Sequence, residues 1–376
     1  MRKTYKQLAA WALALAGAGA AAEAFNVSQY TNGVPQTTNG VTFVLVTGPG
    51  TVAQISNDTR WTANNVYVLD KLTFVGDGAT LTIEPGTVVR GERATKLGAS
   101  INDPADPGTL IISRGAKIIA NGTKESPIVF TSIDDSNVPG GGATIPPVQN
   151  GAAFGVLQTN IVGSSTNVID NRGLPQGYGP VLVAPLLGST NIGNNGFAHD
   201  SQWGGVIVCG KTRIAQNNVS GVDTPVDPTT AGGRNSGVGA DFIEGFQTFT
   251  GSFSGQYGGT DDDDSSGVMR FLSIRYAGFV LSTGNEINGL TLGGVGRGTV
   301  GEFIEIFNNQ DDGFEWFGGT INMKYLAALF NGDDNFDWDE GFRGKGQFWF
   351  GIQDNTGNYV RSEEHTSELQ SRITIS

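Results

Sequence analysis

The chain has 376 residues, of which 57 are glycine and 16% are charged, and its formal net charge is -13. Glycine is unfavourable inside helices and favoured in turns, so this composition argues against a helix-rich fold and favours an all-β chain. The acidic balance argues against a nucleic-acid partner, which needs a surplus of Lys and Arg on one face. One cysteine and two histidines exclude an intramolecular disulfide, a cysteine-rich zinc site and a three-histidine metal centre.

Residues 1–24 have the three segments of a secretory signal peptide. Positive charges near the start precede an apolar run over residues 8–20, and small residues follow it. The apolar run is shorter than the ~20 residues that span a bilayer, and we expect no transmembrane span in the mature chain. We therefore expect an exported protein of the periplasm, the outer-membrane surface or the extracellular space, with a mature chain that begins near Phe25.

Residues 361–376 match the translation of a short-read sequencing adapter. We interpret this segment as an adapter-derived artefact, and we expect the natural sequence to depart from it near Val360 and to continue. The fold is then C-terminally truncated in this sequence. His365 belongs to the same segment, which leaves His199 as the one native histidine.

Three short segments near the front of the chain predict strands, at residues 81–89, 109–122 and 127–132. Each is rich in β-branched residues and ends at Gly, Pro, Asn or Asp. Strands of this length, with tight turns and no helical pattern between them, are typical of a parallel β-solenoid in which each coil stacks on the last.

The remaining segments divide the mature chain into a cap and a solenoid. Residues 25–69 are predicted to cover the open end of the solenoid, which otherwise exposes unpaired strand edges. Residues 70–360 are predicted to form the parallel β-helix itself. Within it, residues 137–200 and 217–239 are rich in Gly, Pro and Asn and show little periodicity, so we expect long surface insertions there.

A repeat near the end of the chain gives the coil length. Residues 302–319 align without a gap with residues 324–341, at an offset of 22, and rare Trp and Phe residues fall in register. A looser copy upstream places residues 289–294 on residues 314–319. The repeat predicts an all-β fold of stacked coils, a right-handed parallel β-helix with long surface loops.

Acidic residues of this repeat predict a metal site. Stacked positions in such coils lie about 4.8 Å apart, so aligned carboxylates form ladders. The candidate ladder residues are Asp311 over Asp333, Asp312 over Asp334, and Glu315 over Asp337. Repulsion between them is relieved by a bound cation, by a raised pKa or by solvation in a turn, and Ca²⁺ with its six to eight oxygen ligands suits such a cluster. The alternative is that these residues only form turns, because Asp and Asn tolerate left-handed backbone conformations.

Aromatic residues alternate with the ladder carboxylates, so one face of each strand carries rings and the other carries acids. Trp316 and Trp338 are candidate ligand-binding residues, because rings that face outward form a platform for sugars. The alternative interpretation is that these rings pack inside the coil.

Enzymatic interpretations rest on the same residues. Polysaccharide lyases and hydrolases use paired carboxylates, or Ca²⁺ with an Arg or Lys base, and Arg343 and Lys345 follow the second ladder. Adjacent acids are common in any Asp-rich solenoid, so we assign no catalytic residue. Residues 261–264 are four consecutive aspartates, for which we expect an exposed loop, with membership of the cation site as the alternative.

Several motifs together resemble a bacterial family of secreted β-helix proteins. They lie at residues 203–211, 243–245, 257–259, 285–296 and 311–319. This family includes a leptospiral outer-membrane lipoprotein and many uncharacterised envelope proteins, some of them labelled multidrug transporters, and the resemblance covers about residues 65 to 354. It implies export and an envelope or extracellular location, and it brings no established catalytic residues. Some members carry a lipid-anchor cysteine, which this chain lacks after its apolar run.

The sequence thus predicts an exported β-helix protein with a surface or binding role. Polysaccharide or another envelope component is the expected partner, and Ca²⁺ is the expected cofactor, if any. The alternative function is a Ca²⁺-assisted polysaccharide lyase or hydrolase on the same scaffold.

Overall fold

The structure is a computed structural model, and the part of the chain that it describes falls into several ranges. These are residues 31–38, 40–92, 107–133, 135, 203–215, 240–282, 285–329 and 331–352. The predicted signal peptide (1–24), the two predicted insertions (137–200 and 217–239) and the adapter-like tail (361–376) lie outside the described residues. Within the described ranges, every regular element is a strand, and no helix there could cross a membrane.

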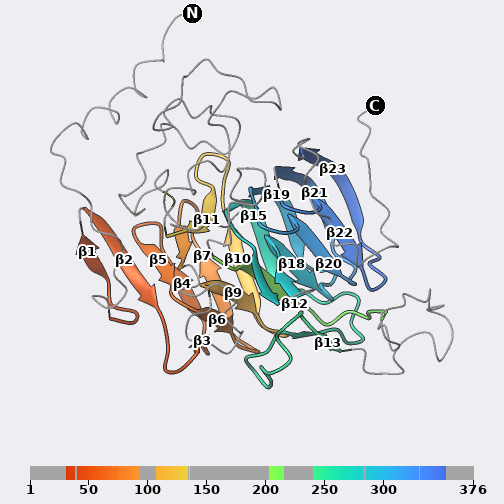
Figure 1. Cartoon of the computed structure of the whole chain (residues 1–376), viewed down its shortest axis with the longest axis horizontal. Coiled ribbons are helices and arrows are strands. Elements are labelled where there is room, and N and C mark those ends of the chain that lie inside the picture. The colour runs from red at the N-terminus through yellow and green to blue at the C-terminus, as the bar shows by residue number, and fades with distance from the viewer. Residues whose placement is uncertain are drawn as a thin grey trace, which may run out of the picture.

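Two large sheets of mainly parallel strands run along the long axis of the molecule, from β2 to β23 (Figure 1). The first sheet contains β1 (Gln36–Thr38), β2 (Val41–Val46), β4 (Thr59–Trp61), β5 (Val66–Leu69), β7 (Thr80–Ile83), β8 (Val88–Gly91), β10 (Lys117–Asn121), β11 (Ile128–Ser132), β15 (Gly267–Arg275), β19 (Val300–Phe307), β21 (Asn322–Leu329) and β23 (Lys345–Ile352). The second contains β3 (Val52–Ile55), β6 (Leu72–Val75), β9 (Thr109–Ile112), β12 (Gly205–Cys209), β18 (Leu290–Gly293), β20 (Phe314–Phe317) and β22 (Phe336–Asp339). Two short antiparallel pairs are β13 (Asp241–Phe242) with β14 (Gln256–Tyr257), and β16 (Phe279–Ser282) with β17 (Asn285–Ile287).

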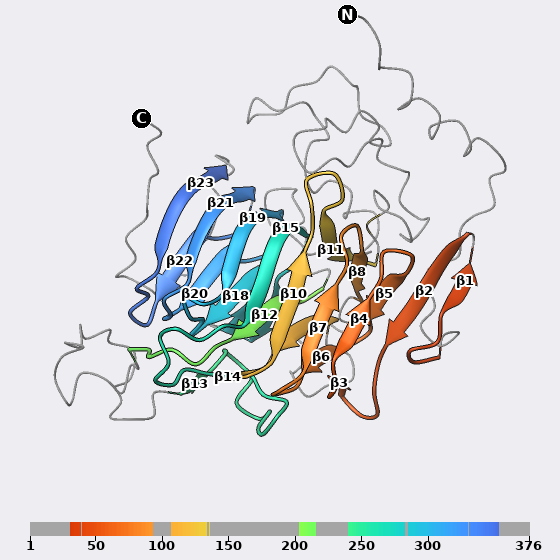
Figure 2. The ribbon, with the colours of Figure 1, turned by 180° about the vertical axis from the view of Figure 1, so that it is seen from behind.

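The parallel pairing of successive coils confirms the predicted parallel β-helix. Each coil contributes strands that pair with the equivalent strands of the coils before and after it, as β9 does with β6 and β12. Such stacking is the physical reason for the short strands, since each strand only has to cross one side of the coil. Figure 2 shows the result from behind, with β4, β7, β10, β15, β19, β21 and β23 side by side.

The coil changes shape at β15. Its first half pairs with β10 and its second half pairs with β11, so two short-strand ladders of the early coils join in one long strand. The strands β19, β21 and β23 then repeat this long strand. The early coils therefore contribute three short strands each, and the later coils contribute one long strand to the first sheet and one short strand to the second.

The later coils follow the predicted offset of 22 residues. Phe314 pairs with Phe336 and Trp316 with Trp338 between β20 and β22, and Glu315 pairs with Asp337 on the opposite face. The same offset holds between β19 and β21. The repeat in the sequence therefore gave the correct register of these coils.

The looser upstream copy is wrong by one residue. The sequence alignment placed residue 289 on Phe314, whereas the structure pairs Leu290 with Phe314 and Leu292 with Trp316. Matching glycine pairs at the strand ends produced the shift. The true register is fixed by the pleat, because a shift of one residue would turn these leucines away from the interior.

The main hydrophobic core fills the inside of the coils. Leu110, Val206, Leu290 and Phe314 are fully or almost fully buried there and come from successive strands of the second sheet. A second cluster lies on the outside of this sheet, where residues Ile243, Phe246 and Tyr257 of the 240–257 segment cover it. The outer face of the second sheet is therefore covered there rather than open to solvent.

Parallel pairing begins within the range assigned to the cap. Strand β2 pairs in parallel with β5, and β3 with β6, whereas β1 folds back on β2 in the antiparallel sense. Stacked coils therefore extend into residues 41–69.

Four aromatic rings stack along the outside of the long strands. Phe271, Phe303, Tyr325 and Phe348 occupy the same position in β15, β19, β21 and β23, with ring centroids 4.6, 4.4 and 4.9 Å apart. All four have positive φ values of 49° to 61°, which marks a repeated bend in the strands. The inner rings cover each other's faces, and the stacking stabilises the bend. Phe348, at the end of the stack, is 59% exposed.

Candidate functional site

The candidate site lies at the turns that enter β20 and β22. Each turn contains a buried asparagine: the Asn309 amide donates to the Asp312 carbonyl at 2.5 Å, and Asn331 Nδ2 donates to the Asn335 side-chain Oδ1 at 2.9 Å. The Asn309 backbone N–H also donates to Asn331 Oδ1 at 3.2 Å, which joins the two turns. The asparagines thus fix the backbone from which the acidic side chains project.

The structure brings five of the six predicted metal ligands together. Carboxylate oxygens of Asp311, Asp312 and Asp333 lie within 4.8 Å of one another, and so do those of Asp312, Glu315 and Asp337. We call these five residues the carboxylate cluster. Asp312 belongs to both groups and joins them. Oxygens that bind one Ca²⁺ at 2.3 to 2.6 Å lie within about this separation, so the donor set fits a hard cation.

Asp334, the sixth predicted ligand, belongs to neither group. Its backbone N–H donates to Asp312 Oδ1 at 2.8 Å, and its carbonyl accepts from the Gly313 N–H at 2.9 Å. Asp334 therefore supports the cluster through its backbone. Its side chain provides a natural control for experiments on the cluster.

Burial and mutual repulsion raise the pKa values of the cluster. Withdrawal from solvent is the largest cause for Asp311, Asp312 and Glu315, and it raises each pKa well above its ordinary value. Neighbouring carboxylates add to the effect: Asp311 acts on Asp312, and Asp312 acts on Glu315. Close, partly desolvated carboxylates that raise one another's pKa are the arrangement that a divalent cation relieves.

Sequence reasoning missed Asp339, whose charge helps to raise the pKa of Glu315, and it also missed two acids and one amide from outside the repeat. The charges of Glu244 and Glu286 help to raise the pKa of Asp311. Asn288 donates from its amide to the Glu315 carboxylate, while its Oδ1 accepts from the Asp312 backbone N–H at 3.0 Å. These residues lie outside the 22-residue repeat, so its alignment could not find them. The one sequence feature that pointed to them is that residues 243–245 and 285–296 belong to the motifs on which the family resemblance rests.

The aromatic candidates face the interior. Trp316 is fully buried in the main core and stacks with Trp349 at 5.0 Å between ring centroids. No face of its indole is left for a sugar ring. Trp338 is partly buried and packs against the same core from the neighbouring strand β22. The acids and rings alternate as expected, and it is the acids that lie on the outer face of this strand.

Within the run of four aspartates, Asp262 is the centre of a group of ion pairs. Asp262 accepts hydrogen bonds from Arg343 at 2.9 and 3.0 Å and from Arg213 at 3.2 Å, and Arg297 lies 3.9 Å away. The hydrogen bond from Arg343 is the largest cause that lowers the pKa of Asp262. The run therefore ties its loop to the last coils of the described structure.

The raised pKa values predict how stability depends on pH and Ca²⁺. A carboxyl with a raised folded-state pKa binds more protons in the folded than in the unfolded protein, so the free energy of unfolding falls as pH rises above about 4. We expect EDTA-treated protein to have a lower Tm at about pH 8 than at about pH 5. Because Ca²⁺ binds ionised carboxylates, we expect a larger Ca²⁺-induced rise in Tm at the higher pH.

Glu305 provides the control for this measurement. It is buried, and its burial raises its pKa to about 7, so it contributes to the same pH trend without belonging to the cluster. In the Glu305→Gln variant, we expect a weaker pH trend in EDTA and an unchanged gain from Ca²⁺. A Ca²⁺-induced rise in Tm that is equal at both pH values would contradict the role of the cluster.

Comparison with known proteins gives one match. A family model described as a pectate-lyase-like β-helix domain matches residues 53–146 and 193–376. Neither the curated proteins nor the solved structures include a match to the chain. The matched residues include all the later coils and every residue of the carboxylate cluster.

Proposed function

Because the chain belongs to the family of pectate-lyase-like β-helix domains, we propose that it binds an acidic polysaccharide through Ca²⁺ held by the carboxylate cluster. The observation that carries this proposal is the pair of carboxylate groups that share Asp312. Ca²⁺ takes six to eight oxygen ligands, so an ion held by the cluster would accept oxygens of the polysaccharide beside those of the carboxylates. The family description supports a polysaccharide-active or binding role in general.

Export is part of the same proposal. The signal-like composition of residues 1–24 supports a location outside the cytoplasm, at the cell envelope or beyond it. Free Ca²⁺ there is commonly in the millimolar range that modest oxygen sites require. A site that fills only outside the cytoplasm is consistent with a surface or envelope role.

Binding is favoured over cleavage by the surroundings of the candidate bases. The Arg343 guanidinium is held by Asp262 and by the Arg213 carbonyl, at 3.1 Å for the latter. Lys345 begins β23 in the first sheet, whereas the cluster lies at the entry to β20 and β22 of the second sheet. Neither residue is therefore positioned as a base beside the cluster.

A binding and turnover assay tests the proposal. We expect the full chain to bind polygalacturonate or alginate in about 1 mM Ca²⁺ and to lose this binding in EDTA. The Asp334→Asn variant should bind like the wild type. Equal binding of neutral polysaccharides in EDTA would contradict the proposal, and release of unsaturated or new reducing ends would favour the lyase or hydrolase alternative.

A further inference from the structure

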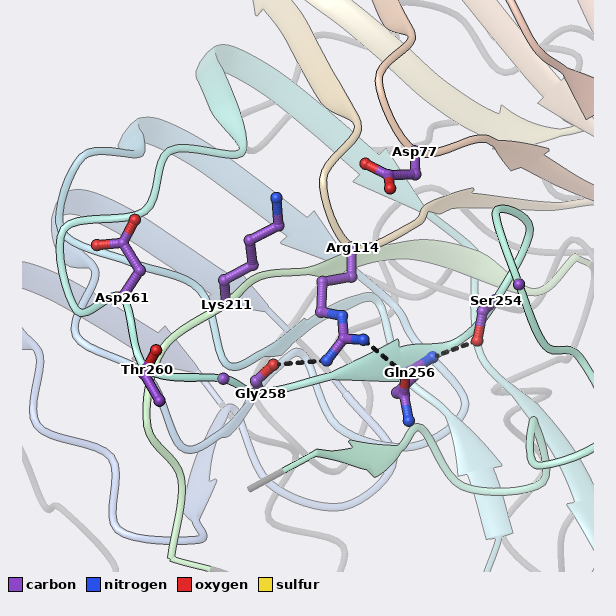
Figure 3. A pocket seen from close by; sticks show the side chains of 10 residues that line it. Asp77, Arg114, Lys211, Ser254, Gln256, Gly258, Thr260 and Asp261 are labelled. Carbon is purple, nitrogen blue, oxygen red and sulfur yellow. Dashed lines mark hydrogen bonds between the residues drawn. The ribbon is translucent and has the colours of Figure 1, made fainter. Parts of the chain in front are cut away.

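A polar pocket of about 350 Å³ lies away from the carboxylate cluster, at the carboxyl ends of β6, β9 and β12. Asp77, Arg114 and Lys211 follow these three strands in successive coils and line one side (Figure 3). Residues 251–261 contribute the other side. Its volume is at the lower end of the range of small-molecule sites.

Hydrogen bonds between separate segments of the chain hold the wall of the pocket in place. Arg114 donates to the Gly258 carbonyl at 2.9 Å and to Gln256 Oε1 at 2.7 Å, which fixes β14 against the turn after β9. The Asp77 N–H donates to the Ser252 carbonyl at 2.9 Å, and the Asp261 N–H donates to the Lys211 carbonyl at 2.9 Å. The pocket is thus preorganised by contacts that connect segments far apart in the sequence.

Two opposite charges face this pocket without pairing. Neither the Lys211 ammonium nor the Asp77 carboxylate makes a hydrogen bond or ion pair with any described residue, although the Lys211 charge acts on the Asp264 carboxylate. In Figure 3, Lys211 extends between Asp77 and Asp261, while the Arg114 guanidinium turns toward β14. The unpaired groups are available to a ligand.

Gly115 shows how close the two charges are. A Cβ atom at this residue would lie 1.9 Å from Asp77 Oδ1 and 3.1 Å from Lys211 Nζ, so both groups border the same small space above the turn. Asp77 Oδ1 itself fills the place that a Cβ at Gly115 would take, so a ligand has to approach the two groups from the open side of the pocket. The two groups are too far apart for an ion pair, and a small molecule on that side can contact both.

We propose that this pocket binds an α-amino acid or a similar small zwitterion. The ligand's carboxylate would accept a hydrogen bond from Lys211, and its ammonium would donate one to Asp77. In an α-amino acid both groups are attached to the same carbon atom, which suits the short distance between Lys211 and Asp77. The lining by Gly251, Thr260 and Gln256 suits a polar side chain. A hydroxy acid offers Asp77 only a neutral hydroxyl, and charge-assisted hydrogen bonds are the stronger ones.

Calorimetry with the full chain tests this assignment. The probes are L-serine, L-asparagine and L-glutamine, each at up to about 10 mM, and L-glycerate as the hydroxy-acid analogue of L-serine. We expect at least one amino acid to bind, and L-glycerate to bind about tenfold more weakly than L-serine. We also expect Lys211→Met and Asp77→Asn to weaken amino-acid binding about tenfold each, while Lys117→Met on the exposed face of β10 has no effect.

Two results would overturn the proposal. One is the absence of binding by all three amino acids. The other is binding of L-glycerate as tight as that of L-serine, which would assign the pocket to hydroxy acids. Neither side chain makes a hydrogen bond or ion pair within the described structure, so both variants should keep the fold. Lys211→Met also removes a charge that acts on Asp264, so thermal melting of each variant is measured beside its binding.

Discussion

Replacing Asp312 with asparagine is expected to weaken Ca²⁺ binding about 100-fold, which corresponds to ~2.7 kcal/mol. Asp312 is the one residue shared by both carboxylate groups, so its loss removes a charged ligand from each. Asparagine keeps an Oδ1 that can accept from the Asp334 N–H, as Asp312 does at 2.8 Å. The variant should therefore keep its fold, and calorimetric titration of EDTA-treated protein measures the change.

The free protein supplies a second readout for this variant. Because Asp312 is buried beside other carboxylates, its removal relieves repulsion. We expect Asp312→Asn to have a higher Tm than the wild type in EDTA at about pH 8 and to gain little from added Ca²⁺. Asp334→Asn is the matched control and should retain the wild-type affinity. Equal Ca²⁺ affinities of Asp312→Asn and the wild type would exclude the cluster as the binding site.

Replacing Trp316 with alanine is expected to cost about 3 to 5 kcal/mol of unfolding free energy. The indole is fully buried and packs against Phe314, Phe336, Phe342 and Trp349. Its removal leaves a cavity between successive coils that the rigid sheets cannot close. Urea unfolding in EDTA measures this loss without a contribution from Ca²⁺.

Two controls separate core packing from other effects. Trp338 occupies the equivalent position one coil later and is only partly buried, so Trp338→Ala should cost about 1 to 2 kcal/mol. The Trp316 indole N–H is buried without a hydrogen-bond partner, so Trp316→Phe removes an unsatisfied donor and should be tolerated within about 1.5 kcal/mol. A loss for Trp316→Ala below that for Trp338→Ala would contradict its place in the core.

The repeat made much of this architecture predictable. An offset of 22 residues placed Glu315 beside Asp337 and Trp316 beside Trp338, and the strands pair in that register. Gapless repetition is informative because stacked coils of equal length must put equivalent residues side by side. The acids of the cluster were predictable for the same reason, since they lie on the repeat itself.

Other features depend on contacts that no repeat encodes. Glu244 and Glu286 reach the cluster from segments outside the 22-residue unit, and Lys211 approaches Asp77 from a strand more than a hundred residues later. The sequence also did not determine which side of each strand faces the interior, because rings and acids alternate and either set could face inward. Burial of Trp316 resolves this: the rings fill the coil, and the acids are left on the outer face.

The central claim is that Ca²⁺ binds at Asp312, between the two carboxylate groups. Anomalous X-ray diffraction from crystals of the full chain grown in Ca²⁺ tests it most directly. We predict a strong peak within about 2.6 Å of an Asp312 carboxylate oxygen, with further ligands from the cluster. A peak at Asp262 and its neighbours instead, or no peak near Asp312 at saturating Ca²⁺, would contradict the account.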